Sequence, residues 1–202
     1  MKDFAQRKRV LRQRLGAVLR EIDAERLHEA SIAAANCLTA TDAFRQAESI
    51  MIFLPLRHEI DARPIALRAW QEGKTITAPL VGVAQKNIIP VEVRSFEEPM
   101  DEDRYGVMTP RGGRPFPVEM LDLVVVPGLG FDRDGHRLGR GCGYYDRFLA
   151  QPTMRAVTCG LAMDVQVVEQ VPVGPYDVPM DMLVTDLELL EFNHRAVANH
   201  AG

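Results

Sequence analysis

The sequence has little cysteine and lacks long apolar segments. Its three cysteines form no CxxC pair, which disfavours a disulfide framework and a cysteine-based zinc site and fits a reducing compartment. No stretch approaches the roughly 18 uninterrupted apolar residues of a membrane helix, and the first residues contain no apolar core of a secretory signal. These absences predict a cytoplasmic protein with no membrane partner.

Three familiar ligand-binding motifs are absent as well. A P-loop requires G-x-x-x-x-G-K-[ST], and the chain contains no such segment. The dinucleotide fingerprint G-x-G-x-x-G would require glycine where Tyr144 stands. The five histidines show neither the H-E-x-x-H pattern nor another zinc-ligand spacing. The sequence therefore argues against a P-loop, a Rossmann cofactor site and a histidine zinc site.

The composition is that of an ordinary globular protein. Hydrophobic residues make up 47% and charged residues 26%, and the formal net charge is −4. The 15 glycines and 13 prolines are spread along the chain, which argues against a long disordered segment. A length of 202 residues predicts a single domain over 1–202. The overall acidity gives no reason to expect nucleic acid as a partner.

Positive charge is concentrated at the start of the chain. Residues 1–20 carry seven basic side chains and one acidic one, a net charge of +6 that leaves −10 for the rest. Apolar residues recur there at helical spacing, which predicts an amphipathic helix. Lys8 and Arg12 are one turn apart beside the apolar stripe. Taken alone, such a charge run is more often a solvated helix face than a binding surface.

Further along, helical and strand patterns alternate. A helical pattern covers 24–47, and continuous apolar runs typical of buried strands occupy 49–56 and 121–126. This alternation predicts an α/β fold, with a largely parallel open sheet flanked by helices on both faces and a basic helix at the N-terminus. Residues 95–118 are predicted to be a long irregular connection. The other expected elements are helices over 62–73 and 144–150 and strands over 75–81, 88–94, 156–163 and 182–186.

A glycine-rich segment, residues 128–143, joins the strand at 121–126 to the helix at 144–150. Open α/β sheets bind ligands at the carboxyl ends of their strands, where this segment begins. Alternating glycines let the backbone approach a ligand, and the arginines favour an anion such as phosphate. The alternative is a glycine-rich surface loop with solvated arginines.

The segment LGFDRDGHRLGRGCGYYDRFL, residues 129–149, resembles the signature of the 5-formyltetrahydrofolate cyclo-ligase family. Three further segments fit the same family in order: 8–12, 53–61 and 171–185. The resemblance implies an ATP- and Mg²⁺-dependent ligase that converts 5-formyltetrahydrofolate to 5,10-methenyltetrahydrofolate and releases ADP and phosphate. It also implies that the formyl oxygen is phosphorylated first, a step that depends on positioning and charge neutralisation.

The resemblance assigns nucleotide, metal and catalytic roles to named residues. It reverses the interpretation of the basic helix at the start of the chain, because Lys8 and Arg12 match residues of the family that contact ATP. Asp146 and Asp181 match two magnesium-binding carboxylates, which suit a hard cation. Arg140 and Tyr144 are the implied catalytic residues. The implied ATP-binding residues are Lys8, Arg12, Arg137, Leu138, Gly139, Arg140, Gly141, Cys142, Gly143, Tyr144 and Tyr145.

The resemblance also assigns residues to the folate. Leu54 and Glu59 match substrate contacts, and a carboxylate at position 59 suits the N–H donors of a pterin. Arg140 and Tyr144 are implied to touch the substrate too. Tyr105 either supplies an aromatic wall for the flat pterin or is an ordinary surface tyrosine, and the sequence favours neither.

Other functions compete with the ligase. A non-catalytic paralogue that binds folate or nucleotide is the main alternative, although such a protein is expected to lose a metal carboxylate or a phosphate-binding arginine. Nucleic-acid binding lacks interleaved aromatic residues, and a sugar-phosphate isomerase rests on fold analogy alone. The predicted partners are ATP and 5-formyltetrahydrofolate, with or without further glutamates on its tail. The protein is expected to be a monomer.

Overall fold

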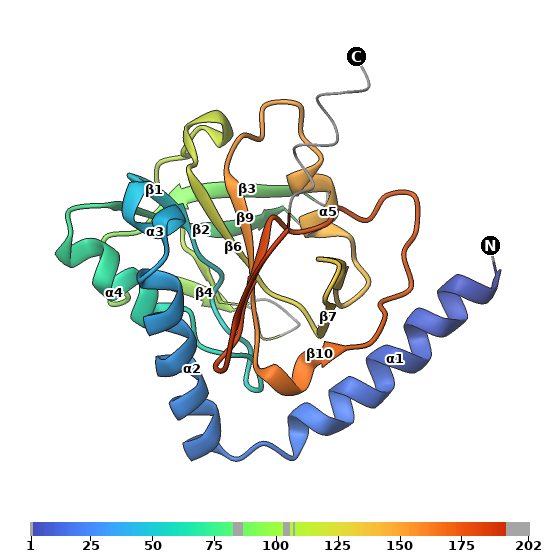
Figure 1. Cartoon of the computed structure of the whole chain (residues 1–202). Helices are drawn as coiled ribbons and strands as arrows, with labels where there is room; N and C mark the ends of the chain where they lie inside the picture. Colours follow the sequence, from blue (N-terminus) through green and yellow to red (C-terminus); the bar gives the residue numbers. More distant parts are fainter. Residues whose placement is uncertain (1, 83–86, 103–105, 107, 193–202) are drawn as a thin grey trace.

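The computed structural model describes residues 2–82, 87–102, 106 and 108–192. The central sheet has seven strands: β1 (Ser49–Met51), β2 (Thr75–Gly82), β3 (Asn87–Glu92), β6 (Leu123–Val126), β9 (Val157–Leu161), β11 (Met182–Val184) and β12 (Leu189–Glu191) (Figure 1). Their order is β12-β11-β9-β6-β1-β2-β3. The inner neighbours run parallel, whereas β12 and β3 at the two sides are antiparallel to their neighbours.

Helices cover both faces of this sheet. They are α1 (Lys2–Arg20), α2 (Ala24–Thr39), α3 (Asp42–Gln46), α4 (Arg63–Gln71) and α5 (Tyr144–Leu149). Successive residues of a strand point to opposite faces. Leu123 and Val125 of β6 accordingly pack in one cluster with side chains of α2 and α4, and Val124 and Val126 pack in another with those of α5. The predicted mostly parallel α/β sheet is confirmed.

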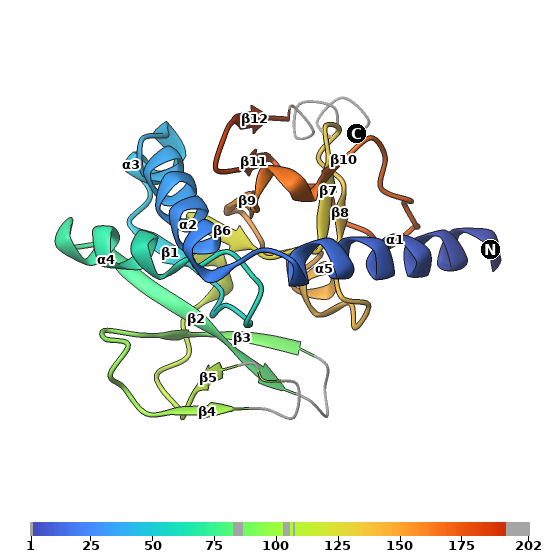
Figure 2. The ribbon, with the colours of Figure 1, turned by 90° about the horizontal axis from the view of Figure 1, so that it is seen from below.

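The first helix forms an arm along one side of the sheet. Figure 2 shows α1 passing the side of the molecule that holds β7 (Gly130–Asp132), β8 (Arg137–Leu138) and α5. Its buried Leu15 packs against Leu138 and Val171 in a small apolar cluster. The predicted amphipathic helix is thus confirmed. None of the described helices is long and apolar enough to cross a membrane.

Several local predictions differ from the structure. The helical pattern over 24–47 divides into α2 and α3, because the side chain of Thr41 caps the second helix. The first strand ends at Met51, although residues 52–54 beyond it remain buried. The predicted irregular connection contains a hairpin of β4 (Met100–Glu102) and β5 (Met108–Pro110). The remaining short elements are β10 (Val167–Val168), which pairs with β7, and two 3₁₀ turns at Val118–Met120 and Asp164–Gln166.

Candidate functional site

A cavity of about 1120 Å³ lies at the carboxyl ends of β1 and β6. Its walls come from α1, the chain after β1, the end of β2, the start of β3, residues 127–128, the loop before α5, α5 itself and residues 175–178. Ligand pockets usually measure about 300–1,000 Å³, so this cavity is slightly larger than that range. It lies where open α/β sheets bind ligands.

The glycine-rich loop, defined as residues 139–143, folds against α1. Gly141 and Gly143 have φ angles of +107° and +67°, which residues with a side chain rarely adopt. Arg12 of α1 donates from Nε to the carbonyl oxygen of Gly139 at 2.8 Å. A Cβ atom on Gly141 would lie 3.5 Å from Arg12 Cζ. The guanidinium of Arg12 thus lies against the backbone of this loop at the cavity wall.

Lys8, one turn before Arg12, holds the segment at 175–178. Its ammonium group is buried and forms an ion pair with Asp177. The same carboxylate accepts a hydrogen bond from the backbone N–H of Gly174 at 2.6 Å. The ring of Phe4 lies beside Lys8, 5.1 Å from the ammonium nitrogen to the ring centroid. The predicted nucleotide-binding face of α1 thus points into the cavity and not into solvent.

Arg137 supports Asp146. Its Nη2 donates to Asp146 Oδ1 at 2.9 Å, and its Nη1 donates to the carbonyl oxygen of Pro127 at 3.2 Å. The side chain is almost fully buried, and its Cζ lies 5.7 Å from the ring centroid of Tyr145. These contacts fix the guanidinium, so Arg137 orients a carboxylate at the cavity wall in addition to carrying positive charge there.

Arg140 and Glu59 join the two sides of the cavity. Arg140 Nη2 lies 2.7 Å from Glu59 Oε1, and Arg140 Nε lies 2.9 Å from the same oxygen. Glu59 Oε2 accepts from the backbone N–H of Leu56 at 3.0 Å. The ion pair links the chain after β1, which also carries the buried Leu54 of the cavity wall, to the glycine-rich loop. Residues predicted for folate and for ATP are therefore in direct contact.

The remaining residues that the sequence assigned to the site differ in how far they are exposed to the cavity. Tyr144 and Tyr145 begin α5 and line the cavity. Burial raises the pKa of Tyr145, so its phenol stays protonated at neutral pH. Cys142 is exposed on the cavity wall. Leu138 is fully buried and supports the loop from behind, so its side chain does not fit the predicted contact with ATP. Tyr105 lies outside the described residues.

Asp181 is not brought to the cavity. It precedes β11, and its Oδ2 accepts from the backbone N–H of Thr158 at 2.8 Å and from the Thr158 hydroxyl at 2.9 Å. Since β9 and β11 are parallel and both begin here, this is the edge of the sheet opposite the cavity. The predicted metal role of Asp181 does not fit this position, because its carboxylate joins the starts of two strands.

Asp177 is a carboxylate at the cavity wall to which the sequence analysis gave no role. It lies in the same family-like segment, four residues before Asp181, and it lines the cavity together with Asp146. A signal was present in the sequence: Asp181 directly precedes a strand, which places it at the amino end of a parallel sheet, whereas Asp177 lies in the preceding loop. Carboxylates at the cavity wall suit Mg²⁺, which commonly takes one or two of them together with substrate phosphates and water.

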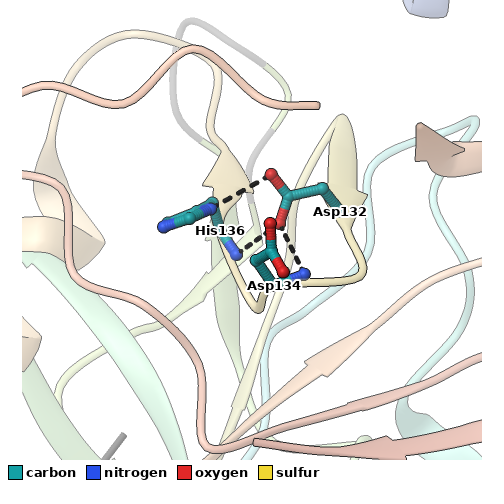
Figure 3. Close-up of side chains that lie close together, drawn as sticks. All are labelled: Asp132, Asp134 and His136. Carbon is teal, nitrogen blue, oxygen red and sulfur yellow. Dashed lines mark hydrogen bonds and ion pairs between the residues drawn. The ribbon is translucent and has the colours of Figure 1, made fainter. Parts of the chain in front are cut away.

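A second acidic cluster lies at the turn between β7 and β8. Asp132, Asp134 and His136 offer donor atoms within 4.8 Å of one another (Figure 3). Asp132 is buried, and its carboxylate accepts from the backbone N–H groups of Asp134, His136 and Val171, while its Oδ2 lies 3.1 Å from His136 Nδ1. These bonds account for the cluster as the structural core of a tight turn.

Comparison with known proteins gives a family match. Residues 4–186 match the 5-formyltetrahydrofolate cyclo-ligase family. The chain belongs to this family. The 5-formyltetrahydrofolate cyclo-ligase of Mus musculus is 30% identical over 184 residues, which cover 86% of this chain and 91% of the relative. The enzyme of the same name from Haemophilus influenzae is 30% identical over 144 residues, 69% of this chain and 77% of its own length.

Solved structures of 5,10-methenyltetrahydrofolate synthetases share the fold. The structure from Aquifex aeolicus superposes with a TM-score of 0.79 at 28% identity, and the match covers 92% of this chain and 93% of that one. The structure from Mycoplasma pneumoniae has a TM-score of 0.72 at 21% identity, with 89% and 98% covered, and at this identity it speaks for the fold alone. The predicted family and enzyme class of this cyclo-ligase family member are confirmed.

Proposed function

We propose that this protein converts 5-formyltetrahydrofolate and ATP to 5,10-methenyltetrahydrofolate, ADP and phosphate, with Mg²⁺. The observation that carries the proposal is that one cavity has an apolar wall with one carboxylate on one side, and the glycine-rich loop with nearby cations and two further carboxylates on the other. A flat, partly apolar folate and a polyanionic nucleotide need surfaces of these two kinds. The reaction requires both substrates in one place.

The apolar wall is the proposed folate side. Leu54 and Leu56 come from the chain after β1, Pro79 and Val81 come from the second half of β2, and Ile88 comes from the start of β3. Such side chains suit the face of a pterin. Glu59 adds the only carboxylate on this wall among the described lining residues. Each carboxylate oxygen has two lone pairs, so Glu59 Oε2, which accepts from Leu56, can accept one further hydrogen bond from a pterin N–H.

The opposite wall is the proposed nucleotide side. Lys8 and Arg12 of α1 and Arg140 of the glycine-rich loop bring positive charge to the cavity. Arginine is suited to phosphate oxygens, because its planar fork donates two hydrogen bonds at once. The loop glycines leave its backbone open to close approach. Charge neutralisation and positioning are the main contributions that a protein makes to phosphoryl transfer.

Asp146 and Asp177 are the proposed holders of Mg²⁺. Both line the cavity, and both supply hard oxygen ligands. Arg137 fixes the first carboxylate and Lys8 fixes the second, so each is oriented before any ion binds. When bound, the ion neutralises charge on the phosphate oxygens. Asp181 has no part in this assignment.

The proposed reaction has three steps. The formyl oxygen attacks the γ-phosphorus, the bond to the bridging oxygen breaks, and ADP leaves while N5 shares its lone pair with the formyl carbon. N10 then adds to that carbon and loses its proton to solvent. Last, the carbon–oxygen bond breaks, its electron pair leaves with phosphate, and the methenyl bridge remains. Arg140 is placed to balance the negative charge that moves between the substrates.

The test is the absorbance band of the methenyl product. Purified protein is mixed with 5-formyltetrahydrofolate and Mg-ATP, and parallel samples omit ATP or Mg²⁺. We expect a rise that requires both, with one ADP formed per product. Folate or nucleotide binding without a rise would favour the non-catalytic paralogue. No binding and no rise would contradict the assignment.

Thiol labelling gives an independent test of the nucleotide side. Cys142 is exposed on the cavity wall, Cys37 is partly buried and Cys159 is fully buried. We expect Mg-ATP to slow alkylation of Cys142 while labelling of Cys37 is unchanged. Equal protection of both thiols would indicate a general change in the protein and would contradict a nucleotide at the loop.

A further inference from the structure

The ion pair between Glu59 and Arg140 uses groups that both proposed substrates need. Arg140 Nε donates to Glu59 Oε1 at 2.9 Å, and Arg140 Nη2 lies 2.7 Å from the same oxygen. A carboxylate oxygen has two lone pairs, so these two donors take up Oε1. Oε2 accepts from the backbone N–H of Leu56 and has one lone pair left. With Arg140 in place, the carboxylate can therefore accept one more hydrogen bond.

A pterin presents two neighbouring donors to such a carboxylate. Its exocyclic amino group and the adjacent ring N–H point in the same direction, and a parallel pair of donors matches the two oxygens of one carboxylate. Oε2 of Glu59 can take one of these donors. The other needs Oε1, so Arg140 has to give up at least one of its two contacts when a pterin binds in this way.

Arg140 is the half of the ion pair that can move. Its side chain is 48% exposed, whereas the side chain of Glu59 is 10% exposed and is also held by the Leu56 backbone. Exposed side chains change rotamer rapidly. Both residues line the cavity, and Arg140 belongs to the glycine-rich loop on the nucleotide side. Once it leaves Glu59, the guanidinium can turn its donors toward a phosphate oxygen, an acceptor that arginine favours.

On the basis of the proposed function, we propose that Glu59 is a positioning residue for Arg140 and that their ion pair couples the binding of the two substrates. Folate takes over the carboxylate and releases the arginine to the nucleotide. A nucleotide that binds alone takes the arginine and leaves the carboxylate without its cationic partner, so it binds weakly until folate supplies new donors. Because coupling between two binding sites is reciprocal, each substrate should strengthen the binding of the other by the same factor.

The wild-type protein provides the first test. Calorimetry measures the Kd of the β,γ-imido analogue of ATP, with Mg²⁺, in the presence and absence of saturating 5-formyltetrahydrofolate. The analogue does not transfer its γ-phosphoryl group, so both ligands stay intact. We expect folate to lower the Kd of the analogue about fivefold or more, and the analogue to lower the Kd of folate by the same factor. A Kd of the analogue that does not change with folate would overturn the proposal.

The Glu59→Gln variant tests the ion pair itself. The amide keeps an oxygen for the Leu56 N–H but removes the charge that holds Arg140. We expect this variant to bind the analogue about fivefold more tightly than wild type in the absence of folate, whereas damage to the cavity would weaken binding. The matched control is Glu92→Gln, which removes a carboxylate from the pair with the exposed Arg94 outside the cavity lining and should bind the analogue like wild type. Unchanged or weaker binding by Glu59→Gln would overturn the proposal.

A double-mutant cycle separates the release of Arg140 from simple charge repulsion. Removal of a carboxylate from the cavity wall also lessens the repulsion of phosphate groups, whatever Arg140 does. In an Arg140→Gln background, we expect Glu59→Gln to leave the Kd of the analogue unchanged, and folate should no longer lower it. A gain in affinity that persists without Arg140 would assign the effect to repulsion and would overturn the proposal.

The methenyl absorbance assay of the wild-type protein distinguishes this proposal from the proposed function. If the wild-type protein forms no methenyl product, the proposed function itself fails. If it forms the product but binds folate and the analogue independently of each other, only the coupling through Glu59 and Arg140 is overturned.

Discussion

The two edges of the central sheet use carboxylates in opposite ways. At the carboxyl ends of the strands, Asp146 and Asp177 line a cavity and pair with Arg137 and Lys8. At the amino ends, Asp181 accepts hydrogen bonds from the neighbouring strand, as described above. Asp122 does the same there, since its Oδ2 accepts from the backbone N–H groups of residues 48 and 49 at 2.9 Å.

This difference shows how the same residue type acquires two roles. At the amino edge, a carboxylate satisfies backbone N–H groups at the start of a strand, and its removal leaves those donors without a partner. At the carboxyl edge, a carboxylate is held by a cationic side chain at a cavity wall, where an arriving metal ion or phosphate can share the pair. The first role is structural and the second is open to chemistry.

The sharpest test of the comparison exchanges one carboxylate at each edge for an amide. For Asp146→Asn we expect a loss of turnover of about 10³-fold, because a metal ligand that stabilises the transferred charge contributes several kcal/mol. Asp181→Asn is the matched control and should keep near wild-type turnover. Methenyl absorbance at saturating and limiting Mg²⁺ measures both. Equal losses of turnover in the two variants would contradict the different roles of carboxylates at the two edges of the sheet.

Removal of the cation that joins the two sides of the cavity should have the next largest effect. For Arg140→Ala we expect kcat to fall about 10²-fold, because positive charge is lost where negative charge moves between the substrates. Arg133→Ala is the control: Arg133 forms an exposed ion pair with Glu188 outside the cavity. Such surface pairs contribute little. Unchanged turnover in Arg140→Ala would contradict its placement in the site.

The amino edge should respond in stability and not in turnover. For Asp181→Ala we expect the free energy of unfolding to fall by about 1–3 kcal/mol, because the Thr158 N–H and hydroxyl lose their acceptor. Turnover of the folded variant at 25 °C should stay within about twofold of wild type, since Asp181 is remote from the cavity. Urea unfolding and methenyl absorbance measure the two quantities. A variant with wild-type stability and lost turnover would return Asp181 to the site.

The smallest expected effect concerns the contact that seats the start of α1. A Cβ atom on Gly174 would lie 2.7 Å from Cζ of the Phe4 ring, so Gly174→Ala should displace that ring from the segment that carries Asp177. We expect KM for Mg-ATP to rise about threefold, a cost below 1 kcal/mol. Gly16→Ala, whose Cβ would meet only Arg20 at 3.8 Å, should stabilise α1 without changing KM. Equal KM values for Mg-ATP in the two variants would show that the contact of Phe4 in α1 does not contribute to nucleotide binding.

The sequence predicted the main elements well because apolar runs mark buried strands. It overestimated the first strand: residues 52–54 stay buried after the ladder ends, since they turn into the core and the cavity wall. Apolarity reports burial and does not report hydrogen bonding between strands. The hairpin of β4 and β5 escaped prediction for the opposite reason, because β4 (Met100–Glu102) is polar and largely exposed.

The candidate site was predictable wherever the motif itself supplies the residues. The glycine-rich loop, Tyr144, Tyr145 and Asp146 are close in sequence, and they meet at the cavity wall. The second metal carboxylate was assigned to Asp181 because a motif gives the order of residues and not the edge of the sheet that they reach. The motif likewise does not show that the side chain of Leu138 is fully buried in β8.

By itself, the sequence determined the α/β class, the basic first helix and the family, because buried runs, helical spacing and a long specific motif are local properties of the chain. Only the tertiary structure decided which charges meet. The pairs Lys8–Asp177 and Arg140–Glu59 join residues 169 and 81 positions apart. The physical reason is that pairing and burial depend on distances between segments, which the fold of the whole chain sets.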